Sequence, residues 1–246
     1  MQHRSKKIKK SFFIILVVLI VLSGGSAIYL GNYYHSVDVE KYMNGSSEVS
    51  VEKFDKGWFF DGAGEEKALI FDPGAKVATE AYAPLMYQLA ESGIDCFLVD
   101  MPFHMAFFGM NRAEEIMQEY NYEAWYLGGH SLGGAMAANF AADYVEDHTD
   151  GIRGLLLLAA YPTKDLSTSD MSVVTVYGSE DGVLNMDKIV AGRELMPQDY
   201  KEVCIEGGNH AQFGSYGAQK GDGTAAIPAE EQWARTVEVF VGDESE

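Results

Sequence analysis

Basic residues and cysteines are both scarce in this sequence. Only 18 of its 246 residues are Lys or Arg, against 37 Asp and Glu, so the formal net charge is −19. A nucleic-acid-binding protein needs a basic surface for the phosphates, so this composition argues against a nucleic-acid partner. The two cysteines, Cys96 and Cys204, are too few for a small disulfide-stapled domain. Because each lies in an apolar run, we expect two buried thiols rather than the one disulfide that a pair permits.

The sequence also lacks the patterns that hold common cofactors. No cluster of Cys and His has the spacing of metal ligands, and no Gly-rich dinucleotide fingerprint occurs. We therefore predict neither a metal nor an organic cofactor. There is no internal repeat, and the length suffices for one domain with a substantial core. Nothing in the composition predicts an oligomeric state.

One long apolar run stands apart at the N-terminus. Residues 1–11 form a basic leader without an acidic residue, and residues 12–30 carry no charge. A run of this length just spans a hydrocarbon core of about 30 Å. Basic residues on its N-terminal side predict a single-pass signal anchor in the cell membrane, with the leader in the cytoplasm and the rest of the chain outside. The alternative is a signal peptide cleaved near Gly25 or Ala27, which would give a secreted protein.

Residues 31–48 are interpreted as a polar linker, and residues 49–246 as one domain. Alternating residues predict an antiparallel strand pair over 49–60. Continuous apolar runs, typical of strands buried on both faces, then alternate with helical patterns. This order predicts an α/β fold with a mostly parallel eight-stranded sheet flanked by helices. The strands are expected at 49–54, 57–60, 68–71, 96–99, 124–127, 155–160, 173–177 and 201–205, and the helices at 79–91, 112–119, 132–144, 186–195 and 229–241.

The pattern Gly129-x-Ser131-x-Gly133 lies between an expected strand and an expected helix. This is the context of a nucleophile elbow, a sharp turn that exposes a serine at the end of a central strand. The turn strains the backbone at the serine, and only very small residues fit two positions before and after it. Ser131 is therefore the predicted nucleophile. The pattern alone is also compatible with a Gly-rich turn that has no chemistry.

Two further residues follow expected strands and complete a catalytic triad. A serine hydroxyl needs a base to remove its proton, and His210 follows the last strand. The imidazole in turn needs a carboxylate, and Asp181 follows the strand at 173–177, with Glu180 as a rival acid. The chain order Ser, Asp, His is that of the α/β-hydrolase fold. Taken singly, Asp181 suits a plain turn and His210 a solvated loop.

The developing negative charge on a substrate oxygen requires two N–H donors. The first predicted donor is the backbone of Leu132, directly after the nucleophile. The second should come from the loop after the strand at 68–71, where we favour Ala75, with Lys76 as the alternative.

Four segments together resemble the α/β-hydrolase superfamily. They are Ala-Leu-Ile-Phe-Asp-Pro-Gly-Ala-Lys-Val (68–77), Gly-His-Ser-Leu-Gly-Gly-Ala (129–135), Tyr-Gly-Ser-Glu-Asp-Gly (177–182) and Glu-Gly-Gly-Asn-His-Ala-Gln-Phe-Gly (206–214). They look most like small bacterial members related to the dienelactone-hydrolase group, with serine as the nucleophile. The resemblance implies a carboxylic-ester hydrolase, esterase-like or lipase-like, with the triad above. Many esterases have His-Gly where this chain has Pro73-Gly74.

The expected substrate is a small-molecule or lipid ester. Only about ten residues separate Tyr161 from the next strand, so no large cap domain fits there and the pocket should be open. The residues expected to contact the substrate are Lys76, Phe103, His104, Phe107 and Phe213, although the Phe-rich stretch suits core packing equally well. Rival functions are a peptidase or amidase on the same triad and a non-catalytic binding module with this fold.

Overall fold

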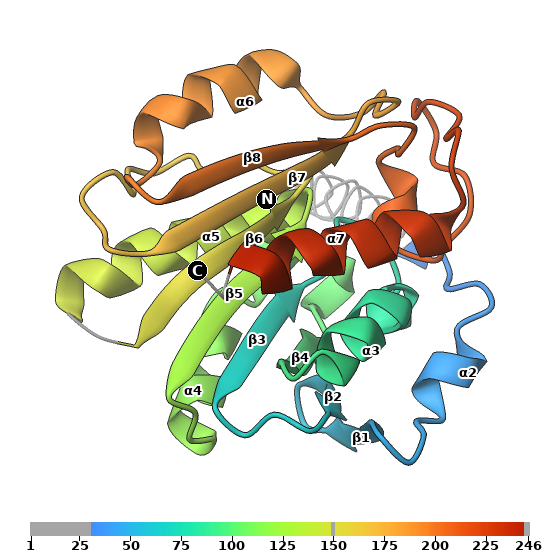
Figure 1. Cartoon of the computed structure of the whole chain (residues 1–246), viewed down its shortest axis with the longest axis horizontal. Helices are drawn as coiled ribbons and strands as arrows, with labels where there is room; N and C mark the ends of the chain where they lie inside the picture. Colours follow the sequence, from blue (N-terminus) through green and yellow to red (C-terminus); the bar gives the residue numbers. More distant parts are fainter. Residues whose placement is uncertain (1–30, 149–150, 244–246) are drawn as a thin grey trace, which may run out of the picture. The chain divides into compact units, whose positions relative to one another are not determined.

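An eight-stranded sheet with strand order β1-β2-β4-β3-β5-β6-β7-β8 runs through the computed structural model (Figure 1), which describes residues 31–148 and 151–243. The pairs β1–β2 and β2–β4 are antiparallel and the five other pairs are parallel, which confirms the predicted sheet. The strands are β1 Ser50–Phe54, β2 Gly57–Asp61, β3 Lys67–Asp72, β4 Asp95–Val99, β5 Ala124–His130, β6 Ile152–Leu158, β7 Ser172–Gly178 and β8 Tyr200–Ile205.

Helices cover both faces of the sheet. Buried residues of α3 and α7 belong to one apolar cluster, and buried residues of α4 and α5 belong to a second cluster on the opposite face. The helices are α2 Glu40–Met43, α3 Ala83–Glu91, α4 Arg112–Glu119, α5 Leu132–Asp147, α6 Met186–Gly192 and α7 Ala229–Asp243. Short 3₁₀ segments lie in the loops: η1 Thr79–Tyr82, η2 Pro102–His104, η3 Ala106–Phe108, η4 Arg193–Leu195 and η5 Ala211–Phe213.

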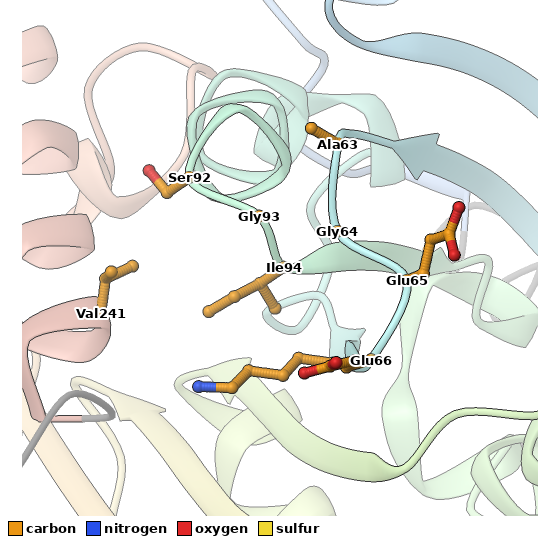
Figure 2. Close-up of a pocket in the computed structure, with 9 residues that line it drawn as sticks. Ala63, Gly64, Glu65, Glu66, Ser92, Gly93, Ile94 and Val241 are labelled. Carbon is orange, nitrogen blue, oxygen red and sulfur yellow. The ribbon is translucent and has the colours of Figure 1, made fainter.

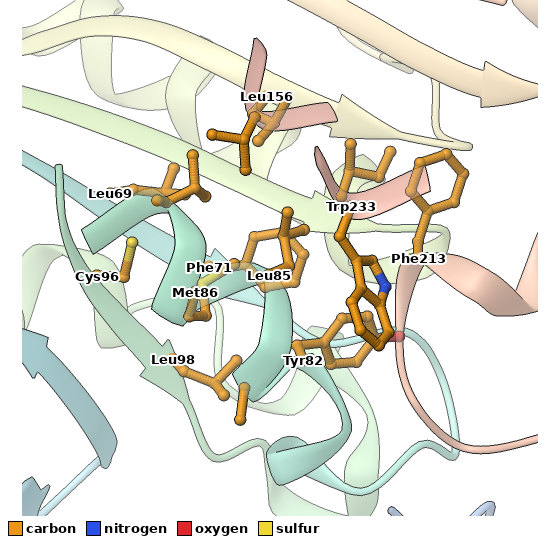
Figure 3. Packing of buried hydrophobic residues seen from close by; sticks show 14 of the residues in the cluster. Leu69, Phe71, Tyr82, Leu85, Met86, Cys96, Leu98, Leu156, Phe213 and Trp233 are labelled. Atoms are coloured by element: carbon orange, nitrogen blue, oxygen red, sulfur yellow. The ribbon is translucent and has the colours of Figure 1, made fainter. Parts of the chain in front are cut away.

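The two clusters follow from the alternation of side chains along each strand. On β3, Ala68 and Ile70 join one cluster and Leu69 and Phe71 join the other, because successive side chains point to opposite faces. Figure 3 shows Leu69 and Phe71 packed among Tyr82, Leu85 and Trp233. On the other face, the buried alanines of α5 allow the helix to lie close to the sheet; they are Ala137, Ala138, Ala141 and Ala142.

Several details differ from the sequence-based expectations; for example, the helix expected over 186–195 is divided into α6 and η4. The helix expected over 79–91 is divided into η1 and α3, with Pro84 in the first turn of α3, where a missing N–H costs nothing. The strand expected over 155–160 begins at Ile152 and ends at Leu158, and Ala159 turns away with a φ of 47°. Both cysteines are free, and Cys204 is exposed because β8 is an edge strand, so the expectation of two buried thiols is wrong for Cys204.

The predicted leader and membrane span, residues 1–30, lie outside the described residues. Of the helices that the structure does describe, none combines the length and the hydropathy needed to cross a membrane. Within the stretch interpreted as a linker, Tyr34 forms a parallel bridge with Val77, and Val39 is buried. The compact unit therefore begins at Tyr34.

Candidate active site

Ser131 occupies a sharp turn between β5 and α5. Its φ of 53° and ψ of −119° are strained for a non-glycine residue, and its N–H donates to the Leu158 carbonyl at 2.8 Å. The flanking glycines have no room for a side chain. A Cβ on Gly129 would lie 2.6 Å from the Asp72 carbonyl oxygen, and one on Gly133 only 2.1 Å from it. The glycine spacing therefore allows β5, α5 and the loop after β3 to meet at the serine.

His210 and Asp181 form a buried pair at the same edge of the sheet. The His210 Nδ1 lies 2.8 Å from the Asp181 Oδ2, and both side chains are only 2% exposed. The other carboxylate oxygen of Asp181 accepts the N–H groups of Val183 and Leu184, each at 2.8 Å. With Nδ1 engaged, Nε2 is the ring nitrogen of His210 that is available to act as a base, and Ser131 lines the same cavity as His210. Glu180, the rival acid, is exposed and accepts from the Ser179 hydroxyl instead.

Two residues that the sequence analysis missed hold the loop that carries His210. The Asp222 carboxylate accepts the N–H groups of Gly182 (3.1 Å), His210 (3.2 Å), Ala211 (2.8 Å) and Gly223 (2.9 Å). Asp222 therefore connects the loop that carries Asp181 to the loop that carries His210. The only sequence signal for it was a Gly-Asp-Gly turn.

Gln232, on α7, is the second of these residues. It is fully buried and binds the backbone of Asn209 on both sides. Its Oε1 accepts the Asn209 N–H at 3.0 Å, and its Nε2 donates to the Asn209 carbonyl at 2.8 Å. The side chain thus replaces the partners that a strand would give this backbone. No local sequence pattern marks a glutamine in an amphipathic helix for this role.

Two backbone N–H groups are available for an oxyanion. Leu132 is the first residue of α5, and the N–H groups of a first helical turn have no intrahelical acceptor. In the loop after β3, the Lys76 N–H donates to the His104 carbonyl at 2.7 Å, whereas the Ala75 N–H has no acceptor within residues 31–148 and 151–243. Of the two alternatives for the second donor, the geometry favours Ala75. The positive end of the α5 dipole also favours negative charge here.

A buried tyrosine–histidine pair stabilises the loop after β3. The Gly74 N–H donates to the Tyr82 hydroxyl at 3.0 Å, and that hydroxyl lies 2.7 Å from the His130 Nδ1. Since the hydroxyl already accepts from Gly74, we assign its proton to His130. A Cβ on Gly74 would lie 2.8 Å from both partners, so only glycine fits.

His130 is not a competitor for the role of base. Burial lowers the pKa of His130 well below its usual value, and the charge of His210 lowers it further, against a smaller opposing effect of the His210 backbone. Burial likewise raises the pKa of Tyr82. Both groups therefore stay neutral at physiological pH. The two imidazole rings lie 4.4 Å apart, centroid to centroid, so His130 forms one wall for the ring of His210.

The cavity over Ser131 is small and largely apolar. Its volume is about 270 Å³, which suits a small acyl or alcohol group rather than a large ligand. Its lining consists of Ser131, Leu132, Ala135, Ala159, Ala160, Tyr161, Val183, Leu184, Asn185 and His210.

The residues predicted to contact the substrate are not in that lining. Phe213 is fully buried, with its ring 5.7 Å from that of His130. Phe103 and Phe107 are exposed, and Lys76 and His104 are half-buried on adjoining loops. The cavity wall contributed by residues 183–185 was missed, because a polar turn after β7 gave no sign that it covers the serine.

A second cavity, of about 520 Å³, opens at the opposite end of the strands, where β3 and β4 begin. It lies beside the segments that lead into β3 and β4, as Figure 2 shows for Gly64, Glu66 and Ile94. It contains no pairing of a nucleophile with a base. Across the part of the chain that the structure describes, no group of three His, Cys, Asp or Glu side chains could hold a metal ion.

The strand order, the turn at Ser131 and the sequence order of Ser, Asp and His together define a protein of the α/β-hydrolase class. The chain belongs to the alpha/beta hydrolase family, whose model matches residues 68–234.

Solved structures share this fold at low identity. An esterase from Pyrobaculum calidifontis is 14% identical with a TM-score of 0.61, over 84% of this chain and 88% of that one. A thermostable esterase from Pseudomonas putida is 17% identical with a TM-score of 0.58, over 90% and 88%. A monoacylglycerol lipase from Paleococcus ferrophilus is 14% identical with a TM-score of 0.57, over 80% and 99%. None of the curated proteins matches the chain.

Proposed function

We propose that the protein is a serine hydrolase that cleaves carboxylic esters through an acyl-enzyme on Ser131. The observation that carries this proposal is the buried pair of Asp181 and His210, whose histidine lines one cavity with a serine on a strained turn. That arrangement supplies a nucleophile, a base and an orienting carboxylate. The esterases and the lipase that share the fold favour an ester over other substrates.

The proposed reaction has two halves. The Ser131 Oγ attacks the ester carbonyl while His210 Nε2 takes the hydroxyl proton, and the Leu132 and Ala75 N–H groups bind the oxyanion. Collapse of the tetrahedral intermediate breaks the bond to the alkoxy group, which leaves as an alcohol with the proton from His210. Water then attacks the acyl-enzyme, again with His210 as the base, and releases the acid and Ser131.

We also propose that residues 12–30 anchor the protein in the cell membrane, with residues 1–11 in the cytoplasm and the catalytic domain outside. The uncharged run and its basic leader support this orientation. Protease added to intact cells should then degrade the domain and spare the leader. N-terminal sequencing of the mature protein distinguishes the secreted alternative, since cleavage near Gly25 or Ala27 would give a new terminus.

Hydrolysis of p-nitrophenyl esters by the full chain tests the catalytic proposal. We expect turnover of short acyl esters, because the cavity is small, and its loss in Ser131→Ala. A fluorophosphonate probe should label the unaltered chain and not this variant. Turnover of an anilide but no ester would favour an amidase. A folded chain that neither turns over substrate nor takes the label would instead be a binding module.

A further inference from the structure

Three phenylalanine rings lie together on the surface beside the active-site edge. Phe103, Phe107 and Phe108 are 57%, 43% and 52% exposed. Their centroids are 5.6 Å apart for Phe103 and Phe108, and 4.1 Å apart for Phe107 and Phe108. We call these three residues the aromatic patch. A group of exposed apolar rings of this kind marks an interaction surface more often than scattered single residues do.

The loop backbone holds the patch outward. Phe103 and His104 both have positive φ values, 57° and 55°, which side-chain-bearing residues rarely adopt in succession. Beneath the rings, Met101 and Ala106 are buried in the core. The exposed rings therefore belong to an anchored loop with a strained backbone, and such strain is typical of functional segments.

The patch adjoins the proposed oxyanion loop. It follows the carboxyl end of β4, and η3 packs against α5, the helix that begins next to Ser131. The His104 carbonyl accepts the Lys76 N–H at 2.7 Å. The loop that carries the aromatic patch is thus joined by one hydrogen bond to Lys76, the residue after Ala75.

Tyr34, the first residue of the compact unit, also binds Lys76. The Tyr34 N–H donates to the Lys76 carbonyl at 2.7 Å, and the Tyr34 carbonyl accepts the Ala78 N–H at 2.8 Å. Lys76 therefore binds the patch loop through its N–H and Tyr34 through its carbonyl. In the sequence, only residues 31–33 separate Tyr34 from the uncharged run 12–30. Three residues span at most about 10 Å.

The charged side chains beside the patch are paired with one another. A groove of about 520 Å³ is lined by Phe107 and Phe108 together with Lys56, Arg112 and Glu115. Lys56 pairs with Glu115 at 3.8 Å and with Glu119 at 3.4 Å, and Arg112 donates to the Asp100 carbonyl. Over the whole chain, acidic residues outnumber basic ones about two to one. Docking on a lipid surface would therefore rest on the exposed apolar rings and not on attraction between charges.

We propose that the aromatic patch docks on the lipid bilayer that holds residues 12–30, so that the Ser131 cavity opens beside the membrane. A cluster of exposed aromatic rings is a feature of surfaces that bind at a membrane interface. The ester substrate is then a lipid that resides in that bilayer, and this clause rests on the proposed function.

Trp fluorescence of the full chain in phosphatidylcholine vesicles tests the docking without any need for activity. Phe108→Trp should lose about half of its added emission in vesicles with brominated acyl chains, because bromine quenches only rings at acyl-chain depth. Arg153→Trp is the matched control. Arg153 is exposed near the start of β6, at the opposite end of the strands from the patch, so the emission of this Trp should not be quenched. Equal emission of the Phe108→Trp variant in both kinds of vesicle overturns the proposal. A blue shift without quenching also overturns it, because a second copy of the chain would then cover the patch.

Activity tests the substrate clause separately. Phe108→Asp should slow hydrolysis of a monoacylglycerol in these vesicles about tenfold and leave a water-soluble short ester unchanged. Equal slowing of both substrates, or of neither, overturns the clause. If the unaltered chain hydrolyses no ester at all, the proposed function fails, and the quenching experiment still decides whether the patch docks.

Discussion

Asp181 has fixed partners for both carboxylate oxygens, one being His210 and the other the Val183 and Leu184 amides. An Asp181→Asn variant would keep the shape but present an amide to His210, which favours the wrong imidazole tautomer. Ester turnover should fall by about 10⁴-fold, as for other triads. Glu180→Gln is the matched control, because Glu180 is the exposed neighbour, and should stay within about twofold. Steady-state kinetics of both variants would reveal the reverse order if Glu180 were the catalytic acid.

Tyr82 stabilises the oxyanion loop through a single hydroxyl. Tyr82→Phe would leave the buried Gly74 N–H and His130 Nδ1 without partners. We expect a loss of about 2 kcal/mol in the free energy of unfolding, measured by urea titration in a nonionic detergent. Tyr87→Phe loses one exposed hydrogen bond, to Ser46, and should cost under about 0.5 kcal/mol. Equal losses would show that the buried network contributes nothing special.

His130 should make stability depend on pH. Because burial holds its pKa well below the usual value, the folded ring stays neutral, while the unfolded chain takes up a proton below about pH 6.5. Acidification through that range therefore favours unfolding. Between pH 7.5 and 5.5 the unaltered chain should lose about 1 kcal/mol more than His130→Gln.

The comparison of the unaltered chain with His130→Gln separates the contribution of His130 from those of the other titrating groups. Burial raises the pKa of Asp72, so that carboxyl acts in the opposite sense, but it does so equally in both chains. Urea midpoints at the two pH values give the difference. Identical pH dependence in the two proteins would contradict a neutral buried His130.

Among the loops, the one that carries His210 depends on the Asp222 carboxylate. In the unaltered protein, both carboxylate oxygens of Asp222 accept backbone N–H groups, those of His210 and Ala211 among them. Asp222→Asn keeps the size of the side chain but replaces one of these acceptors with an NH₂ donor. The loop should shift, and kcat should fall about tenfold to a hundredfold with little change in KM. Asp187→Asn, at an exposed position in α6, is the control and should leave kcat unchanged. A change in KM alone would place Asp222 at substrate binding rather than at positioning.

The strands and the candidate triad residues could be named from the sequence for a physical reason, and the residues that support them could not. Continuous apolar runs mark strands buried on both faces, and reactive residues gather where such strands end, so Ser131, Asp181 and His210 could be named from local patterns. Asp222 and Gln232 bind backbone atoms that are distant in the sequence, and any polar residue could occupy such a position. The exposure of Cys204 depends on β8 being the edge of the sheet, which only strand order reveals.

On the scale of the whole molecule, the excess of acid over base should make stability rise with salt. The whole chain carries a net charge of −19, and the compact unit, which lacks the five basic residues of the leader, carries −24. This charge repels itself in the compact state, and added salt screens the repulsion. Salt also weakens the ion pairs at the surface, such as that of Arg193 with the partly buried Glu202, but a surface pair contributes only about 1 kcal/mol.

The repulsion should therefore dominate, because it acts across the entire surface whereas the ion pairs are few and exposed. Raising NaCl from 0.02 to 0.5 M shortens the screening length from about 20 Å to about 4 Å and should raise the Tm by a few degrees. Calorimetry of the full chain in nonionic detergent measures it, with Arg193→Gln as a matched variant whose Tm should rise slightly more. A Tm that falls with salt would mean that the ion pairs, and not the net charge, govern the stability of this acidic domain.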